Sequence, residues 1–284
     1  MIKPIDCLKA REEMLAEAKV DVINCLKHSV IPKLVVIQVG DNPASSTYVK
    51  NKIKTCEEVG IESEHIKLKE DISADDLIKA IDAVNEDSKV HGILLQLPLP
   101  EHLAKHEQMF IDRISWNKDV DGLTTENQAR LWSGNLKRIT PCTAEGILRL
   151  LQDDLSGATI TIAGRSKLVG MPLFKLLLDR NATVTMCHSK TEDVGFNAMF
   201  SDVFISAIGK PKHFKSDDCA GSAIIDVGIN RDENGKLCGD IDWDSFREDG
   251  IETLCTPVPK GVGVLTTAQL MLNTLKCVKF QKLV

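Results

Sequence analysis

The sequence has few aromatic residues and no excess of positive charge, and both shortages narrow the range of functions. Eight Phe, three Trp and one Tyr occur among 284 residues, and 35 Lys and Arg stand against 41 Asp and Glu, for a formal net charge of −6. Proteins that bind nucleic acids or anionic membranes carry a basic excess, and single-stranded nucleic acids are commonly held by stacked aromatic rings. We therefore expect no nucleic-acid partner and no membrane partner.

Long apolar runs and ordered cysteines are missing as well. No run of 18 apolar residues occurs, the N-terminal MIKPIDCLKAREEML has no apolar core, and the nine cysteines are scattered without a CxxC pair. A membrane-spanning helix needs about 20 apolar residues, and disulfide frameworks or zinc sites need regularly spaced cysteines. The seven histidines lack the spacing of metal ligands, and no GxSxG elbow is present. We expect a cytoplasmic protein without a metal site.

What the sequence does contain is an alternation of strand-like and helix-like segments. In the first half, strands are expected at 33–40, 65–69 and 91–100, and helices at 8–28, from an N-cap at Ser45 or Ser46 to Gly60, and at 73–85 behind Ser73. In the second half, a helix is expected at 141–155 with Thr143 as N-cap, then β-branched runs at 158–164, 182–188, 202–209 and 223–230, and a last helix at 265–280 that packs back on the first half. This order predicts an α/β protein of two domains with parallel sheets.

The stretch 158–189 predicts a βαβ unit that binds a dinucleotide. Its first strand is followed by GRSKLVG, with Gly164 and Gly170, where backbone N–H groups and a helix N-terminus can hold phosphate. The second strand ends at Cys187, His188, Ser189 and Lys190, without the acid that commonly accepts from the ribose of NAD. Arg165, Ser189 and Lys190 could accommodate a 2′-phosphate instead, which favours NADP over NAD. The alternative is a βαβ crossover whose glycine turn holds no ligand.

Tyr48 and Lys52 lie four residues apart on an expected helix and therefore share one face. A phenol beside a lysine of lowered pKa can form a catalytic pair. In the alternative interpretation Lys50, Lys52 and Lys54 form a solvated helix edge. A YxxxK pair is also typical of short-chain dehydrogenases, but there it follows the cofactor loop, whereas Tyr48 precedes Gly164.

Two further places carry polar groups in unexpected surroundings. Gln96 lies at the end of an apolar strand, where α/β proteins place functional groups, although local backbone could also satisfy its amide. Asp119 and Asp121 in DVDG form either a pair of carboxylates for an amine-rich substrate or a turn-forming pair. The residues alone leave both alternatives open.

These elements, in this order, resemble the bifunctional methylenetetrahydrofolate dehydrogenase/methenyltetrahydrofolate cyclohydrolase family. The matching motifs are DNPASSTYVKNKIKTCEEVGI, GILLQLPLP, KDVDGL, PCTAEGI, GRSKLVGMPL, TVTMCHSKT, DVGIN, GDIDW and TPVPKGVGVLT, which span nearly the whole chain. The resemblance implies an oxidoreductase and hydrolase of one-carbon metabolism. It would oxidise 5,10-methylenetetrahydrofolate to the 5,10-methenyl form with NADP, and would hydrolyse that form to 10-formyltetrahydrofolate for uses such as purine biosynthesis.

The resemblance also implies an architecture. It predicts a catalytic, folate-binding α/β domain of residues 1–140 plus 265–284 and a Rossmann-like NADP-binding domain of residues 141–264, with a cleft between them. Members of the family are usually homodimers through the nucleotide-binding domains.

Roles for individual residues follow from the resemblance in the same way. Lys52 would be the catalytic acid and base, Gln96 would hold it through a hydrogen bond, Tyr48 would stack on the aminobenzoate of folate, and Asp121 would accept from the pterin. The catalytic set is thus Lys52, Tyr48, Gln96 and Asp121, and the substrate-binding set adds Gly261 and Gly263 to Tyr48, Gln96 and Asp121. The cofactor-binding set is Gly164, Arg165, Ser166, Val169, Gly170, His188, Ser189 and Ile229.

The chain departs from the family pattern in one loop above all. Where most members read PGGVGP, this sequence has Lys260 and Val264 around Gly261 and Gly263. A lysine in place of glycine is unfavourable if the backbone there has a positive φ. The departure motivates two alternatives: a monofunctional dehydrogenase, or a non-catalytic relative that binds dinucleotide or folate.

Overall fold

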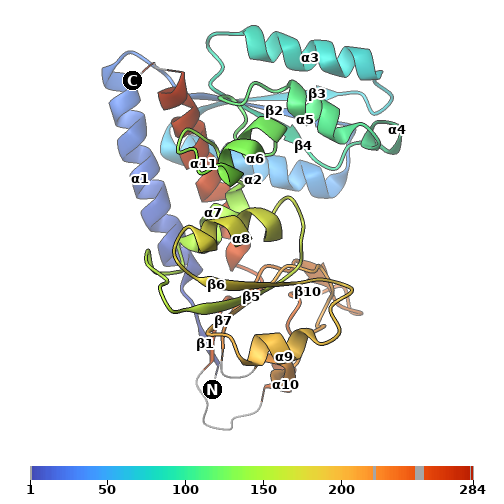
Figure 1. The fold of residues 1–284 in the computed structure, drawn as a ribbon. Coiled ribbons are helices and arrows are strands. Elements are labelled where there is room, and N and C mark those ends of the chain that lie inside the picture. The colour runs from blue at the N-terminus through green and yellow to red at the C-terminus, as the bar shows by residue number, and fades with distance from the viewer. Residues whose placement is uncertain (1, 220–221, 247–252, 282, 284) are drawn as a thin grey trace. The chain divides into compact units, whose positions relative to one another are not determined.

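The protein forms two compact units, each built on a parallel sheet. The structure is a computed structural model that describes residues 2–219, 222–246, 253–281 and 283 (Figure 1). One unit joins the first twelve residues to Thr143–Thr266, and the other joins Glu13–Cys142 to Thr267–Val284. The predicted α/β class, with parallel sheets and mixed helices, is confirmed.

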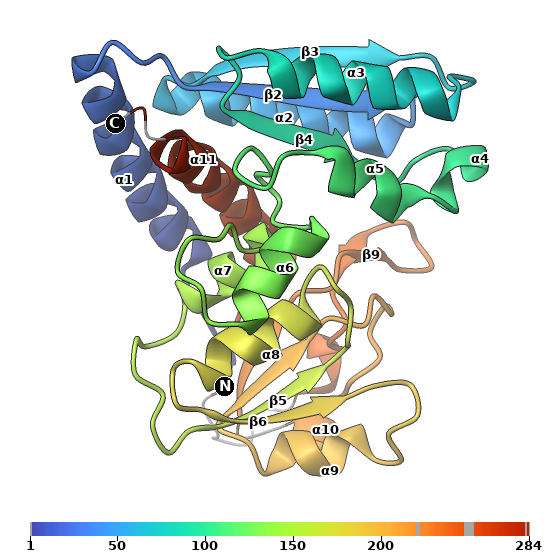
Figure 2. The same ribbon diagram turned by 45° about the horizontal axis from the view of Figure 1, so that its top comes forward.

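The unit built from Glu13–Cys142 holds a three-stranded sheet with the order β3-β2-β4. Its strands are β2 (Lys33–Val39), β3 (Glu62–Leu68) and β4 (Gly92–Gln96), and β2 pairs with both neighbours in parallel. Two helices, α2 (Pro43–Val59) and α3 (Ala74–Glu86), lie on opposite faces of this sheet (Figures 1 and 2). Because β2 is covered on both faces, its sequence is almost continuously apolar.

Alternate residues of these strands face different layers. One face joins odd-numbered residues of β2 and β4 to α3 and to α5 (Glu107–Arg113); its fully buried members include Ile37, Leu77, Ile81, Ile93 and Phe110. Even-numbered residues such as Gln38 and Gln96 therefore point to the opposite face, on which α2 packs. This alternation decides which strand residues can reach the side chains of α2.

The other unit holds a six-stranded sheet with the order β1-β11-β8-β7-β5-β6, parallel throughout. Its strands are β1 (Ile2–Pro4), β5 (Thr159–Ala163), β6 (Thr183–Cys187), β7 (Val203–Ser206), β8 (Ala223–Asp226) and β11 (Thr253–Cys255). Helix α8 (Gly170–Leu178) connects β5 to β6, and α9 (Val194–Met199) lies on the other face of the sheet (Figures 1 and 2). The four β-branched runs of the sequence thus form adjacent strands, as predicted.

The remaining elements connect or cover these layers. They are α1 (Cys7–Lys27), α4 (Glu101–Ala104), α6 (Thr125–Trp132), α7 (Cys142–Leu148), α10 (Ser216–Cys219), the antiparallel pair β9 (Asn230–Arg231) and β10 (Leu237–Cys238), the 3₁₀ turn η1 (Trp243–Ser245) and α11 (Val262–Phe280). Lys279 of α11 makes a 2.7 Å ion pair with Asp21 of α1, so the last helix packs on the first half as expected. None of the described helices is both long and apolar enough to cross a membrane.

Several expectations about element ends were wrong. Helix α2 begins at Pro43, and the Asn42 side chain accepts from the N–H of Ser45, so neither Ser45 nor Ser46 is the N-cap. Helix α7 begins before Thr143 and ends at Leu148 rather than 155. Ser73, by contrast, is confirmed as the N-cap of α3, because its hydroxyl accepts from the N–H of Asp76.

The expected division of the chain differs from the two compact units at the N-terminus. Residues Ile2–Pro4 pair in parallel with β11, and the first twelve residues belong to the unit with the six-stranded sheet rather than to the one that contains α2. The reason is that three residues suffice for an edge strand, which periodicity cannot detect in so short a segment. Met1 and Val284, the outer ends of the expected catalytic domain, lie outside the described residues.

Candidate functional site

Helix α2 and strand β4 bring Lys52 and Gln96 together. Lys52 Nζ donates a 3.0 Å hydrogen bond to Gln96 Oε1, and Gln96 Nε2 donates to the carbonyl oxygen of Leu97 at 2.6 Å. Lys52 is half-buried, whereas Lys50 and Lys54 on the same helix are exposed. The solvated-edge interpretation therefore holds for Lys50 and Lys54 but not for Lys52, which has a fixed partner across 44 residues of sequence.

Tyr48 lies one helical turn before Lys52 on α2, and 49% of its surface is exposed. Residues four apart on a helix share a face, so the phenol ring and the ammonium group are presented together. A ring that is exposed beside a half-buried lysine is open to a flat ligand. The structure thus leaves Tyr48 free to stack on a substrate rather than using it in the core.

A second glutamine, which the sequence did not single out, supports this helix. Gln38 in β2 is 1% exposed and stands beside Gln96 in the parallel register. Its amide nitrogen donates to Ser46 Oγ at 3.0 Å, and its amide oxygen pairs with His65 Nε2 at 3.1 Å. A buried amide costs about 1–3 kcal/mol if it is left without partners. Here it is satisfied, and the bond to Ser46 fixes the first turn of α2.

The two carboxylates of DVDG have different environments. Asp119 is 2% exposed, and its oxygens accept from the backbone N–H groups of Gly122 and Thr124 and from Asn127 Nδ2, each at 2.9 Å. Burial raises the pKa of Asp119, and the bonds from Asn127 and Thr124 oppose that rise. Asp119 is therefore the turn-forming member of the pair. Asp121 is half-buried and can present its carboxylate to a ligand.

Asp121 is linked to the core of its unit through a cysteine. The Sγ atom of Cys142 lies 3.6 Å from Asp121 Oδ1 and 3.4 Å from the carbonyl oxygen of Val120. Burial raises the pKa of the Cys142 thiol well above its usual range; the charge of Asp121 raises it further, and the charge of Lys52 lowers it. The buried thiol of Cys142 therefore belongs to the neighbourhood of Asp121, whose carboxylate it contacts.

The same neighbourhood contains an asparagine that the sequence analysis missed. Asn273, buried in α11, donates its amide hydrogens to the carbonyl oxygens of Val120 at 2.8 Å and Thr140 at 3.0 Å, and lies 3.4 Å from Cys142 Sγ. It therefore fixes both chain segments that lead to Asp121 and Cys142. The available signal was a lone asparagine inside the apolar run LMLNTL.

The predicted phosphate loop lies at the carboxyl end of β5. Gly164 has a φ of 119°, and a Cβ there would lie 2.5 Å from the carbonyl oxygen of Ala207. A Cβ on Gly170 would lie 1.9 Å from the carbonyl oxygen of Gly164. Both glycines are therefore required for the loop to fold closely on itself. At the start of α8, the N–H of Val169 donates to Ser166 Oγ at 3.1 Å and the N–H of Met171 donates to the carbonyl oxygen of Ser166 at 3.0 Å, so bonds from Ser166 close the loop onto the helix.

Polar side chains surround this loop. Arg165, Ser166 and Ser189 are exposed, and His188 is half-buried. The loops after β5 and β6 start side by side, because the N–H of Gly164 donates to the carbonyl oxygen of Cys187 at 2.9 Å. Arginine and hydroxyl groups from two adjacent loops are a donor set that fits a phosphate, and no acid stands at the end of β6.

The other predicted ligand residues of this unit follow β8 and β11. Ile229 is 51% exposed, and a Cβ on Gly263 would touch Ile229 Cδ1 at 3.3 Å. A Cβ on Gly261 would lie 2.0 Å from the carbonyl oxygen of Pro257, so this glycine is required by the turn itself. Lys260 has a φ of 72°, so the lysine lies at a left-handed position, where a residue with a Cβ is unfavourable.

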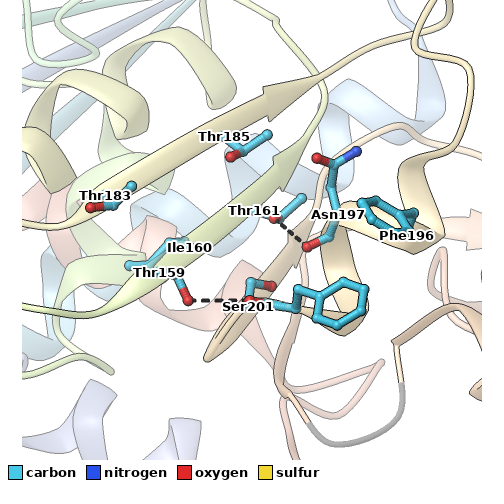
Figure 3. A pocket seen from close by; sticks show the side chains of 9 residues that line it. Thr159, Ile160, Thr161, Thr183, Thr185, Phe196, Asn197 and Ser201 are labelled. Carbon is cyan, nitrogen blue, oxygen red and sulfur yellow. Dashed lines mark hydrogen bonds between the residues drawn. The ribbon is translucent and has the colours of Figure 1, made fainter.

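A pocket elsewhere in this unit does not coincide with the predicted residues. It lies where β5 and β6 meet α9, and it is lined by Thr159, Ile160, Thr161, Thr183, Thr185, Phe196, Asn197, Phe200 and Ser201 (Figure 3). Thr161 Oγ1 donates to the carbonyl oxygen of Asn197 at 3.0 Å. Among the described residues there is no cluster of three His, Cys, Asp or Glu side chains arranged to hold a metal ion.

Two models of one protein family match the two halves of the chain. The catalytic-domain model of tetrahydrofolate dehydrogenase/cyclohydrolase matches residues 5–121, and the NAD(P)-binding-domain model of the same family matches residues 141–282. The bifunctional protein FolD of Bacillus cytotoxicus is 43% identical over 272 residues, which cover 94% of this chain and 93% of that relative.

Solved structures match over the same length. A bifunctional FolD methylenetetrahydrofolate dehydrogenase/cyclohydrolase from Campylobacter jejuni has a TM-score of 0.93 at 39% identity and covers 99% of this chain and 100% of that one. The Trypanosoma brucei enzyme, solved with NADP and an inhibitor, has a TM-score of 0.88 at 30% identity and covers 99% and 98%. Because both domain models and relatives of 43% and 39% identity match, the chain belongs to the tetrahydrofolate dehydrogenase/cyclohydrolase family.

Proposed function

We propose that Lys52 and Gln96 form the catalytic pair of this enzyme. The chain oxidises 5,10-methylenetetrahydrofolate to the 5,10-methenyl form with NADP and hydrolyses the methenyl form to 10-formyltetrahydrofolate, as its family indicates. The observation that supports the pair is the 3.0 Å hydrogen bond from Lys52 Nζ to Gln96 Oε1.

Lys52 can serve as the general base and the general acid that hydrolysis requires. Gln96 accepts one N–H of the lysine and so orients the amine, while the remaining valences of Nζ can face a ligand. In the hydrolysis Lys52 takes a proton from the water that adds to the methenyl carbon. It returns a proton to the ring nitrogen that is released when the carbon–nitrogen bond breaks, so the same group serves as base and then acid.

Asp121 and Tyr48 bind the folate in this proposal. The half-buried carboxylate of Asp121 accepts hydrogen bonds from the amino and ring N–H groups of the pterin, a charge-assisted contact. The exposed ring of Tyr48 stacks on the aminobenzoate portion. The proposed substrate-binding set also includes Gly261 and Gly263. A Cβ on Gly261 would lie 2.0 Å from the carbonyl oxygen of Pro257, so the turn requires glycine there.

NADP, when bound, accepts the hydride that leaves the methylene carbon, and the chain's own residues hold it. Gly164 and Gly170 shape the loop, and Arg165, Ser166 and Ser189 bind the 2′-phosphate. Val169, His188 and Ile229 complete the cofactor-binding set. The supporting observation is that exposed arginine and serine side chains stand on two adjacent loops, which the bond from the N–H of Gly164 to the carbonyl oxygen of Cys187 joins.

We also propose that the enzyme is a homodimer through its NAD(P)-binding unit. Strand β6 is the edge of the six-stranded sheet, and Phe196, Met199 and Phe200 beside it are 59%, 46% and 70% exposed. Figure 3 shows Phe196 at the rim of the pocket beside β5 and β6. An open strand edge next to exposed aromatic rings favours pairing with another chain. The nine free cysteines suit a reducing compartment, and we place the enzyme in the cytoplasm.

One pair of absorbance assays tests the function. The purified protein is given 5,10-methylenetetrahydrofolate with NADP or with NAD, and separately 5,10-methenyltetrahydrofolate alone. We expect NADP reduction in the first assay and accelerated decay of the methenyl absorbance in the second. NADP reduction without accelerated decay would identify a monofunctional dehydrogenase. Neither signal in a protein that binds NADP would identify a non-catalytic relative.

A further inference from the structure

Two buried carboxylates lie in the NAD(P)-binding unit and have no part in the chemistry proposed above. Asp226 ends strand β8 and is 1% exposed, and Asp240 follows β10 and is fully buried. They belong to the motifs DVGIN and GDIDW, and the sequence analysis assigned a role to neither carboxylate. A buried carboxylate is costly unless hydrogen bonds satisfy it, so the partners of each show what it does.

Asp240 accepts five hydrogen bonds, and most come from one loop. Its Oδ2 accepts from Ser206 Oγ at 2.8 Å and from the backbone N–H groups of Ile208 at 2.8 Å and Gly209 at 3.3 Å; its Oδ1 accepts from the N–H of Lys210 and from Asn230 Nδ2, both at 2.9 Å. Three consecutive backbone amides thus converge on one carboxylate. The bond from Asn230 ties the segment after β8 to the loop after β7.

Asp226 holds Asp240 in turn. Its Oδ1 accepts from the N–H of Asp240 at 2.9 Å, and its Oδ2 accepts from the N–H of Ile241 at 3.1 Å. The two motifs interlock through their glycines: a Cβ on Gly228 would lie 2.2 Å from Asp240 Oδ1, and a Cβ on Gly239 would lie 1.8 Å from Asp226 Oδ2. Burial raises the pKa of Asp226 to about 7 in spite of its N–H donors.

The loop that Asp240 holds lies where an open parallel sheet binds its ligand. Chain order runs from β5 to β6 on one side and continues with β7 on the other, so β5 and β7 flank the point where the direction of winding reverses. Ligands of such sheets bind outside the carboxyl ends of the strands at this point. The N–H of Ala207 donates to the carbonyl oxygen of Ala163 at 2.8 Å, so the loops after β7 and β5 are in direct contact.

The direction of the cofactor follows from the proposed function, on which this inference rests. The proposed function assigns the phosphates and the 2′-phosphate to the loops after β5 and β6, so the nicotinamide half would lie on the side of β7 and β8. We propose that Asp240 is a positioning residue for that half of NADP. Its carboxylate fixes the amides of Ile208, Gly209 and Lys210 and the side chain of Asn230, so this edge of the cofactor site is formed before NADP binds.

The variant Asp240→Asn tests the proposal, because the amide keeps the volume but replaces acceptor capacity with N–H donors. We expect the dissociation constant for NADP, measured by calorimetry, to rise about tenfold. Hydrolysis of methenyltetrahydrofolate without NADP should stay within about twofold, because Lys52 lies in the other unit. The matched control is Asp244→Asn, which removes an exposed carboxylate paired with Lys212 and should change neither value. A variant that is folded and binds NADP as tightly as the wild type would overturn the proposal.

Hydrogen exchange of the wild-type protein without NADP keeps the proposal testable if Asp240→Asn does not fold. The amides of Ile208, Gly209 and Lys210 should exchange at least about tenfold more slowly than in an unstructured peptide of the same sequence. Exchange at the peptide rate would overturn the proposal, because the loop would then not be preformed. A wild-type protein with neither enzymatic activity would count against the proposed function alone, since the exchange result does not depend on turnover.

Discussion

Gln38 and Gln96 stand side by side in adjacent parallel strands, and each fixes a different turn of helix α2. Gln38 donates to Ser46 in the first turn, and Gln96 accepts from Lys52 two turns later. Tyr48 lies between these two anchors. Helix α2, which carries the proposed catalytic lysine, is therefore held to the sheet by polar bonds on both sides of Tyr48, and these bonds let a surface helix present side chains in a fixed geometry.

The first prediction concerns the partner of Lys52. Gln96→Met keeps the length of the side chain and removes the acceptor for Lys52 Nζ. We expect the rate constant of methenyltetrahydrofolate hydrolysis to fall about tenfold to a hundredfold, because a lysine without its partner is no longer oriented. The dissociation constant for NADP should not change, since Gln96 lies in the other unit. Hydrolysis at the wild-type rate would show that the hydrogen bond does not position Lys52.

The second prediction concerns the choice of cofactor. Wild-type protein should bind NADP at least about tenfold more tightly than NAD, a difference of about 1.4 kcal/mol. Arg165→Ala should remove most of this preference, because the guanidinium is assigned to the 2′-phosphate, and should leave the affinity for NAD nearly unchanged. Calorimetric titration with both dinucleotides measures this. Equal dissociation constants in the wild type would refute the roles of Arg165 and Ser189.

The third prediction concerns the departure from the family loop. Lys260 has a φ of 72°, a region that costs a residue with a Cβ roughly 1–2 kcal/mol. We expect Lys260→Gly to raise the free energy of unfolding by about 1 kcal/mol, part of the gain being lost to the greater freedom of glycine in the unfolded chain. Lys260→Ala keeps the Cβ and serves as the control, with little change. Equal stability of all three proteins in urea denaturation would show that the loop relaxes without cost.

The fourth prediction concerns the dimer. Phe200→Asp places a charge on the exposed surface beside β6, where 70% of the Phe200 surface is accessible. If two copies pair through this surface, the variant should sediment as a monomer at concentrations at which the wild type is a dimer. Leu136→Asp, at a position that is 82% exposed in the other unit, is the control and should leave the dimer intact. A dimer that survives Phe200→Asp would place the interface elsewhere.

Periodic elements were predictable from the sequence because their signals are local. The runs ATITIAG and ATVTMCH became neighbouring strands, and Ser73 became a cap, since β-branched runs and a serine before two acidic residues act within a few positions. Ser45 and Thr143 were wrongly predicted as N-caps. Asn42 accepts from the N–H of Ser45, and α7 already begins at Cys142, and the sequence pattern does not locate a helix start to within one or two residues. The three-residue strand β1 gave no periodic signal.

Contacts across long sequence separations were predictable only in part. The bond between Lys52 and Gln96 was implied by the family resemblance, because no local rule joins a helix to a strand 44 residues later. The role of Asp119 was left open, because the sequence DVDG is compatible with a turn and with a pair of ligand-binding carboxylates. The burial of Asp119 and its bond from the N–H of Gly122 identify it as a turn residue. The supports at Gln38, Asn273 and Asp240 were missed, because each is defined by the backbone amides or carbonyls that surround it.

The most direct test is the variant Lys52→Ala, measured for methenyltetrahydrofolate hydrolysis and for NADP binding. Hydrolysis of methenyltetrahydrofolate should fall by a factor of at least about 100, as expected when a general acid and base is removed, while the dissociation constant for NADP stays unchanged. Lys54→Ala, on the exposed side of the same helix, is the control and should behave as the wild type. If Lys52→Ala hydrolyses methenyltetrahydrofolate at the wild-type rate, Lys52 is not the catalytic residue and the central claim is wrong.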